Sequence, residues 1–173
     1  AIQLAKAFGA EVYATAGSDA KCATCSALGA TAINYRETDF VQKIMELTRG
    51  KGVDLILDMV AGSYLQRNLN ALALEGTVVM IGLMEGMETN FNIGALLTRR
   101  LTITGSTLWA RTPEQKATIA QELQTEVWPL FAQGHLKPVI SDKFPLEDAA
   151  QAHRLLEEGQ HTGKVLLVME VQP

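Results

Sequence analysis

The stretch Glu11-Val-Tyr-Ala-Thr-Ala-Gly-Ser-Asp-Ala-Lys21 decides the fold. It predicts a strand over Val12–Ala16, a turn at Gly17 and a helix that begins near Ser18, because glycine permits a tight turn and serine is a good N-cap. The end of the strand brings the Ser18 hydroxyl and, about one helical turn later, the Lys21 ammonium to one sheet edge. Ligands of open α/β sheets bind at this edge, where the carboxyl ends of the strands meet.

Outward from this stretch, predicted strands and helices alternate along the chain. Helices of about 10–15 residues between strands indicate βαβ units, so the sequence predicts an α/β fold with a doubly wound parallel, Rossmann-like sheet. The nearly continuous apolar run Val53–Asp58 is typical of a strand buried on both faces. The further predicted strands are Ala32–Tyr35, Thr77–Gly82 after a Glu75-Gly76 turn, and Leu101–Leu108, and the predicted helices are residues 1–8, Asp19–Leu28, Asp39–Thr48, Ser63–Ala73 and Pro113–Gln133.

The sequence pattern changes after Gly134. The following stretch contains two prolines and shows no extended hydrophobic periodicity. We place a domain boundary near Pro138. Residues 1–137 are then a dinucleotide-binding domain. Residues 138–173, with a helix over Leu146–Glu158 and a strand over Gly163–Met169, are too short for a core of their own and are expected to belong to a second domain.

Composition excludes several classes of protein. The 173 residues carry a net charge of −4, so no basic field favours nucleic acid or an anionic membrane. No apolar run approaches the roughly 20 residues that span a bilayer, and no secretory signal pattern is present. Two cysteines without a disulfide framework suit a reducing compartment, so we expect a cytoplasmic protein.

The first residues, Ala1-Ile-Gln-Leu-Ala-Lys-Ala-Phe8, have helical spacing but no cap, no Met and no strand before them. Gly9 then ends the predicted helix. A chain that starts inside a helix is expected to be an N-terminally truncated fragment.

Several short motifs, in order and spacing, resemble the medium-chain dehydrogenase/reductase superfamily, and within it the zinc-free, zeta-crystallin-like NADPH:quinone oxidoreductases. The resemblance covers almost the whole chain. The matching pieces are Ala1–Lys6, Ala16–Lys21, Leu28–Ala30, Ile33–Arg36, Gly52–Asp54, Leu57-Asp58, Gly76, Ile81-Gly82 and Gly163-Lys164.

The resemblance implies an oxidoreductase that transfers hydride from NADPH to a quinone or an activated enone. It also implies a homodimer through the edge strand Leu101–Leu108. In the family a strand and a glycine-rich, pyrophosphate-binding turn precede the position of Ala1, and the preceding strand is the central one of the sheet. Without that strand, we expect a gap between the strands at Val12 and Val53, with weak stability or another segment or copy filling the gap.

The choice of cofactor can be argued from the residues. NAD-selective folds usually place an acid at the end of the second strand of the sheet, and that position here is Ala16. Ser18 can donate to a 2′-phosphate and Lys21 can neutralise it, which favours NADP. The resemblance adds Tyr35 over the same phosphate or the adenine. Asp19 is either a helix-start acid or a source of repulsion, and the competing interpretation makes Ser18 a simple cap and Lys21 a solvated cation.

Later strand ends supply the remaining candidates. The turn Asp58–Gly62, including Val60, is expected near the adenine ribose, although an ordinary strand-to-helix turn explains it almost as well. By resemblance, the segments Ile81–Leu83 and Ser106–Leu108 pass near the nicotinamide, and Lys164 is a late cofactor contact or a surface cation. The full predicted cofactor set is Gly17, Ser18, Lys21, Tyr35, Val60, Gly82, Leu83, Thr107, Leu108 and Lys164. No catalytic acid or base and no metal ligand is apparent.

Three other functions compete with the reductase. Cys22 and Cys25 form a C-x-x-C pair at a helix start, the spacing of a thiol redox protein, although packing within the helix explains them more simply. The chain is alternatively a non-catalytic or dimerisation module with little cofactor affinity. It is also compatible with a relative of the zinc-type alcohol dehydrogenases, although the sequence lacks the additional cysteines of a structural zinc site.

Overall fold

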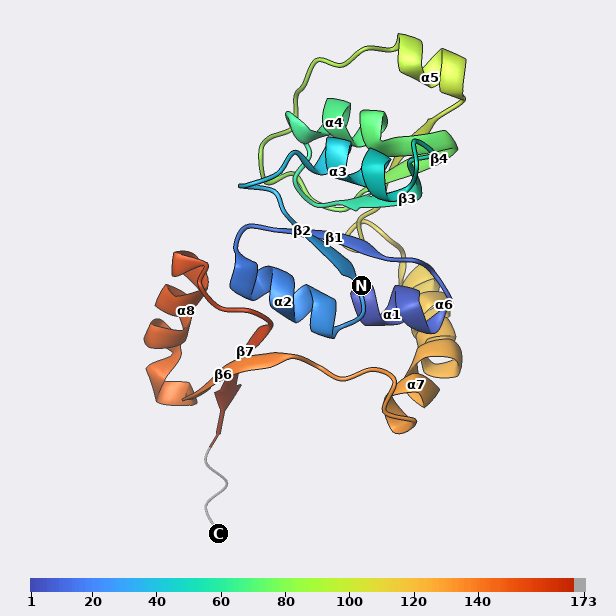
Figure 1. Cartoon of the computed structure of the whole chain (residues 1–173). Helices are drawn as coiled ribbons and strands as arrows, with labels where there is room; N and C mark the ends of the chain where they lie inside the picture. Colours follow the sequence, from blue (N-terminus) through green and yellow to red (C-terminus); the bar gives the residue numbers. More distant parts are fainter. Residues whose placement is uncertain (170–173) are drawn as a thin grey trace.

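The computed structural model describes residues 1–169 and shows helices and strands that alternate over the first hundred residues (Figure 1). The strands are β1 (Tyr13–Ala16), β2 (Thr31–Asn34), β3 (Val53–Asp58), β4 (Leu72–Met80), β5 (Thr102–Gly105), β6 (Ile140–Pro145) and β7 (Lys164–Val168). The helices are α1 (Ile2–Ala7), α2 (Asp19–Ala27), α3 (Phe40–Leu47), α4 (Tyr64–Ala71), α5 (Gly94–Arg99), α6 (Pro113–Glu122), the π-helical η1 (Leu123–Val127), α7 (Trp128–Ala132), the 3-10 helix η2 (Leu146–Asp148) and α8 (Ala149–Glu158).

Every strand pair within residues 1–169 is parallel, which confirms the predicted α/β class. The strands form three separate sheets, β1-β2, β3-β4-β5 and β6-β7. As predicted, β1 and β3 are not hydrogen-bonded neighbours, and β5 lies at the edge of its sheet. The domain boundary near Pro138 stays a prediction.

Helices α3 and α4 cover one face of the β3-β4-β5 sheet (Figure 1). Two groups of buried side chains form this core. One group joins α3 to β2 and the end of α4, and the other joins α4 to β4. Their members are Ile33, Phe40, Ile44 and Ala71 in the first group and Leu65, Leu69, Leu72 and Val78 in the second.

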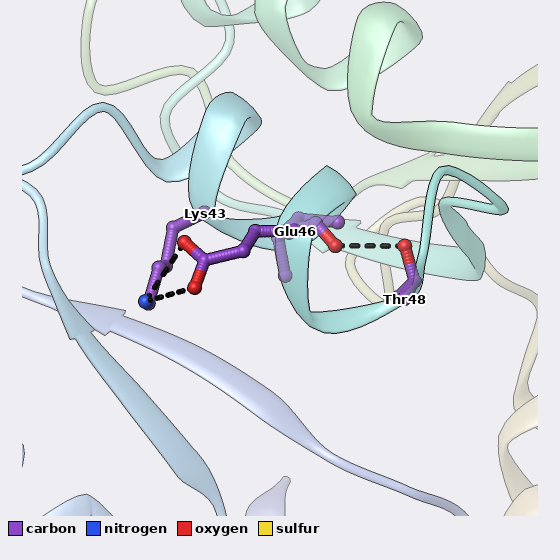
Figure 2. A network of polar contacts seen from close by, with 4 residues as sticks. Lys43, Glu46 and Thr48 are labelled. Atoms are coloured by element: carbon purple, nitrogen blue, oxygen red, sulfur yellow. Dashed lines mark hydrogen bonds and ion pairs between the residues drawn. The ribbon is translucent and has the colours of Figure 1, made fainter.

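Side-chain caps start α2 and α3, and the cap of α2 at Ser18 was predicted from the sequence. Ser18 accepts a hydrogen bond from Lys21 N at 3.4 Å, and Asp39 accepts one from Val41 N at 2.9 Å. At the other end of α3, the Thr48 hydroxyl donates to the Ile44 carbonyl at 2.7 Å. Figure 2 shows this bond beside the i,i+3 ion pair between Lys43 and Glu46.

The prediction that β3 is buried on both faces is wrong. Leu55 and Leu57 are 63% and 48% exposed, whereas Asp58 is buried. Because α3 and α4 pack on only one face of the sheet, the apolar side chains of the other face are left open.

The turn expected at Glu75-Gly76 lies within a longer strand, because β4 begins at Leu72. Val53 pairs with Leu72 and Leu55 with Thr77, so the register shifts where Glu75 adopts a left-handed φ of 63°. The two turn residues therefore form a bulge-like irregularity, and the strand resumes its ladder at Thr77.

The edge strand is shorter than the predicted Leu101–Leu108. Ser106 N still donates to Met80 O at 3.0 Å, but the Ser106 and Thr107 hydroxyls then accept hydrogen bonds from Arg111 and from Trp109 N. These local bonds draw the backbone out of the ladder, so Thr107 and Leu108 lie outside β5. Helix α5, which precedes β5, was not predicted from the sequence.

The long helix predicted over Pro113–Gln133 is interrupted rather than continuous. It starts with a capping box between Thr112 and Gln115, then passes through the π-helical segment η1 before α7. Pro129 explains the interruption, because it lacks an N–H and its ring crowds the carbonyl of Thr125 one turn earlier. Within residues 1–169, every helix falls short of the length and apolarity needed to cross a membrane.

Arg99 and Arg100 are neighbours in the sequence but have different roles. Arg99 is half-buried and donates to the Leu69 carbonyl at 3.0 Å and to the Leu72 carbonyl. It thereby satisfies carbonyls at the end of α4 that belong to fully buried residues. Arg100 makes an exposed ion pair with Glu75 at 2.8 Å.

We expect Arg99→Met to lower the free energy of unfolding by about 1.5–3 kcal/mol, because it leaves buried carbonyls without charged donors. The matched variant Arg100→Met should cost less than about 1 kcal/mol, since its ion pair is exposed to solvent. Urea denaturation of both variants measures the difference. Equal losses would contradict the role given to Arg99.

Candidate cofactor site

The carboxyl ends of β1 and β2 meet around Gly17. Tyr35 follows β2 directly, and its hydroxyl would lie 2.8 Å from a Cβ atom at position 17. Arg36 Nε would lie 3.4 Å from the same atom. Since the φ of Gly17 is not left-handed, glycine is required here for space and not for backbone conformation. The Tyr35 phenol and the Arg36 guanidinium therefore lie over the turn at Gly17. We call this turn together with these two side chains the Gly17 cradle.

Ser18 adds a hydroxyl to this cradle. Its oxygen accepts the Lys21 N–H as the cap of α2, so its proton stays free to donate to a ligand. The N-terminal end of α2, whose dipole favours negative charge, starts at the same point.

Asp19, the acid that complicated the sequence argument, is held by a neighbour. Asn34 at the end of β2 donates its side-chain amide to Asp19 Oδ1 at 2.9 Å. This bond gives the carboxylate a partner beside the cradle.

The structure directs Lys21 elsewhere than the sequence reasoning expected. Its ammonium donates to the Gly159 carbonyl at 2.5 Å, at the end of α8. The cation over Gly17 is instead Arg36, which takes part in none of the ion pairs within residues 1–169. Sequence reasoning missed Arg36, although its position directly after Tyr35 was a usable signal.

A second part of the candidate site lies at the ends of β3 and β4. The turn after β3, which contains Val60, and the segment after β4, which contains Gly82 and Leu83, are joined by backbone hydrogen bonds. Ile81 N donates to Asp58 O at 2.7 Å and Glu85 N donates to Val60 O at 2.9 Å. A Cβ atom at Gly82 would lie 2.8 Å from the Met59 carbonyl oxygen, so glycine lets the two segments approach.

A cavity of about 410 Å³ opens next to these two segments. Its walls come from the start of α4, the end of β4, Ile103 of β5 and the segment that follows β4, and they are mainly apolar. The lining includes Gly62, Leu65, Met80, Leu83, Met87 and Phe91. Of the predicted cofactor residues, only Leu83 borders it.

The remaining predicted cofactor residues are Thr107, Leu108 and Lys164. Thr107 accepts a bond from Trp109 N at 3.4 Å, and Leu108 is 59% exposed. Lys164 starts β7, where its backbone N–H donates to Val139 O at 2.8 Å. Among the bonds of residues 1–169, none ties these three to the Gly17 cradle, and their cofactor roles stay predictions.

Cys25 of the C-x-x-C pair lacks the lowered pKa of an activated thiol. Both cysteines are free, and burial raises the pKa of the Cys25 thiol above its ordinary value of 9.0, with the nearby Cys22 adding to the rise. A catalytic thiol requires the opposite shift. Within the described part of the chain, no group of three His, Cys, Asp or Glu side chains is placed to hold a metal ion.

We expect iodoacetamide to modify Cys25 more slowly at neutral pH than a cysteine in a short peptide. A raised pKa leaves less thiolate at any given pH, so the rate should continue to rise beyond about pH 9. Mass spectrometry of the Cys25 peptide across a pH series measures this rate. A plateau below about pH 8 would revive the thiol redox interpretation.

Parallel βα units with polar groups at the carboxyl ends of the strands are typical of nucleotide-binding α/β domains. The family model described as zinc-binding dehydrogenase matches residues 1–125, and the chain belongs to this family. Its relatives place it in the quinone oxidoreductase branch of the medium-chain dehydrogenase/reductase superfamily.

Two curated relatives illustrate the similarity. Quinone oxidoreductase 1 of Escherichia coli is 35% identical over 97% of this chain, which covers 52% of that protein. A phenolphthiocerol/phthiocerol polyketide synthase of Mycobacterium tuberculosis is 36% identical over 96% of this chain, which covers 8% of the synthase polypeptide. The chain thus spans about half the length of the quinone oxidoreductase and a small part of the synthase.

Solved structures agree on the fold. The E. coli quinone oxidoreductase complexed with NADPH superposes with a TM-score of 0.78 at 33% identity, covering 96% of this chain and 52% of that one. A 2-haloacrylate reductase gives 0.81 at 28% identity over 98% and 53% of the two chains. An NAD-dependent alcohol dehydrogenase gives 0.76 at 36% identity over 96% and 46%.

Proposed function

We propose that this chain is the cofactor-binding part of an NADPH-dependent oxidoreductase that reduces quinones or activated enones. The observation that carries the proposal is the cradle at Gly17, where Tyr35 and Arg36 stand over a turn that has Ala16, and not an acid, at its strand end. An acid at that position would repel a 2′-phosphate, whereas a guanidinium can pair with it bidentately.

The residues present fit the adenosine end of NADPH. Arg36 would neutralise the 2′-phosphate, the Ser18 hydroxyl would donate to it and the phenol of Tyr35 would cover the same pocket. Because the Asp19 carboxylate accepts from Asn34, its charge is partly compensated. When bound, the nicotinamide supplies hydride, while the protein binds and orients the two reactants.

The names of two relatives support the substrate class. Quinone oxidoreductases and a 2-haloacrylate reductase act on acceptors with a carbon–carbon or carbon–oxygen double bond made electron-poor by conjugation. Such acceptors take hydride at carbon or oxygen. The apolar cavity beside Leu83 is compatible with a flat, weakly polar acceptor.

Calorimetric titration of the purified gene product with NADPH and NADH tests the proposal. We expect NADPH to bind about 10–100-fold more tightly, the range of one or two charge-assisted hydrogen bonds. Arg36→Gln should remove most of this difference and leave NADH binding unchanged. Equal affinity for the two cofactors would overturn the 2′-phosphate assignment, and absence of binding would favour the non-catalytic module.

One observation favours a second function, the 36% identity with an NAD-dependent alcohol dehydrogenase. This alternative predicts alcohol-dependent reduction of NAD⁺ and a zinc requirement in the active protein. Assays of NADPH oxidation with quinones and of NAD⁺ reduction with primary alcohols, each with and without a chelator, separate the two functions.

We also propose a cytoplasmic homodimer that pairs two copies through the β5 edge. The support is the position of β5 at the end of its sheet, where its outer backbone groups lack a strand partner within residues 1–169. Light scattering of the purified protein measures the mass, and a monomer at micromolar concentration would contradict this part of the proposal.

A further inference from the structure

Residues 1–169 contain two buried side chains with polar ends, Asp58 at 4% exposure and Asn68 at 5%. Burial of a carboxylate is unfavourable unless hydrogen bonds replace its water shell. No cation among these residues bonds to Asp58. Its partners are instead Val60 N at 2.7 Å, Ala61 N at 3.2 and 3.3 Å, and the Asn68 side-chain amide at 3.0 Å.

These bonds fix a strained turn. Ala61 has a left-handed φ of 59°, which is unfavourable for a residue with a side chain. The Asp58 carboxylate binds the N–H of this residue and of the one before it. The side-chain amide of Asn68, in the middle of α4, donates to the second carboxylate oxygen of Asp58. The turn is therefore linked both to the end of β3 and to α4.

The same turn also fixes the segment after β4. The backbone carbonyls of Asp58, Met59 and Val60 accept hydrogen bonds from Ile81 N at 2.7 Å, Met84 N at 3.3 Å and Glu85 N at 2.9 Å. The Ser63 hydroxyl donates to the Glu85 carboxylate at 2.5 Å and closes the same contact. Both segments that supply Val60, Gly82 and Leu83 are thus one unit built on the Asp58–Asn68 pair.

We infer that Asp58 and Asn68 are positioning residues that hold the two segments in the conformation that receives the cofactor. This inference rests on the proposed function, because it takes the segments as cofactor contacts. Neither side chain touches the ligand in this assignment. If the end of β3 needed only stability, apolar side chains could supply it. A buried carboxylate that is bonded by N–H groups and has no counter-ion instead favours one conformation of a polar turn.

A side-chain exchange tests the inference. Asp58→Asn places two amide NH₂ groups face to face, and Asn68→Asp places two carboxylates face to face. The double variant D58N/N68D restores one donor and one acceptor between the positions and keeps a carbonyl oxygen for the turn. Asn70→Asp, the same change at an exposed position of α4, is the matched control.

The expected result is a rise in KM for NADPH of about tenfold or more in each single variant, with kcat at saturation within about threefold of the parent. The double variant should recover most of the affinity, and N70D should match the parent. Circular dichroism and urea midpoints identify variants that fail to fold, and Asn68→Ala, which leaves the turn bonds of Asp58 in place, then provides a milder test with a smaller rise in KM.

Folded single variants with parental KM would overturn the inference, as would a double variant that is no better than either single variant. A parent protein that binds NADPH and NADH equally, or neither, contradicts the proposed function instead. The two failures are distinguishable, because steady-state kinetics of the variants reports the first and titration of the parent protein reports the second.

Discussion

Gly52→Ala is expected to destabilise the fold by about 3 kcal/mol or more. Gly52 has a left-handed φ of 82°, and a Cβ atom there would lie 2.5 Å from both the carbonyl carbon and the oxygen of Leu72. The Ala71 oxygen is also only 2.7 Å away. These are backbone atoms of the junction between α4 and β4, so no side-chain rotation relieves the clash, and overpacking adds to the cost of the left-handed conformation.

Gly50 provides the matched control. Its φ of 83° is nearly the same, but a Cβ atom there would meet nothing within 4 Å. Gly50→Ala should therefore cost only the backbone term, about 1 kcal/mol. Urea or thermal unfolding followed by circular dichroism measures both variants. Equal losses would contradict the close packing of β3 against the α4–β4 junction.

Ala16→Asp is expected to reverse the cofactor preference. The new carboxylate would stand at the end of β1, where an acid binds ribose hydroxyls and repels a 2′-phosphate. Affinity for NADPH should fall by roughly 100-fold, because like charges brought together cost several kcal/mol, while affinity for NADH is kept or improved.

Ala16→Asn has nearly the same shape as the aspartate variant and lacks its charge. It should leave the ratio of the two affinities within about threefold of the parent. Calorimetric titration of parent, Asp and Asn proteins with both cofactors gives the comparison. If the two variants behave alike, the end of β1 does not face the adenosine phosphate.

Local chemistry explains which features could be predicted from sequence. The Ser18 cap, the alternation of strands and helices and the separation of β1 from β3 depend on short-range signals and strand order. The glycine turn was found for the same reason, since it directly follows a predicted strand, whereas Tyr35 came from the family resemblance.

Other features depend on contacts between distant residues and were missed. Asn68 reaches Asp58 across ten positions, and Lys21 reaches the Gly159 carbonyl across 138. Neither pairing leaves a periodic signal in the sequence. The exposed face of Leu55 could not be predicted either, because the apolar pattern of β3 does not say how many helices pack on its sheet.

The central claim is that the turn at Gly17 accepts a negative group on the adenosine side of a nucleotide. Titration with 2′,5′-ADP and with ADP tests it most directly, because the two ligands differ only in where the second phosphate group is attached and neither carries a nicotinamide. We predict that 2′,5′-ADP binds about tenfold or more tightly than ADP and that Arg36→Gln removes the difference. Equal binding of the two ligands by the parent protein would contradict the claim.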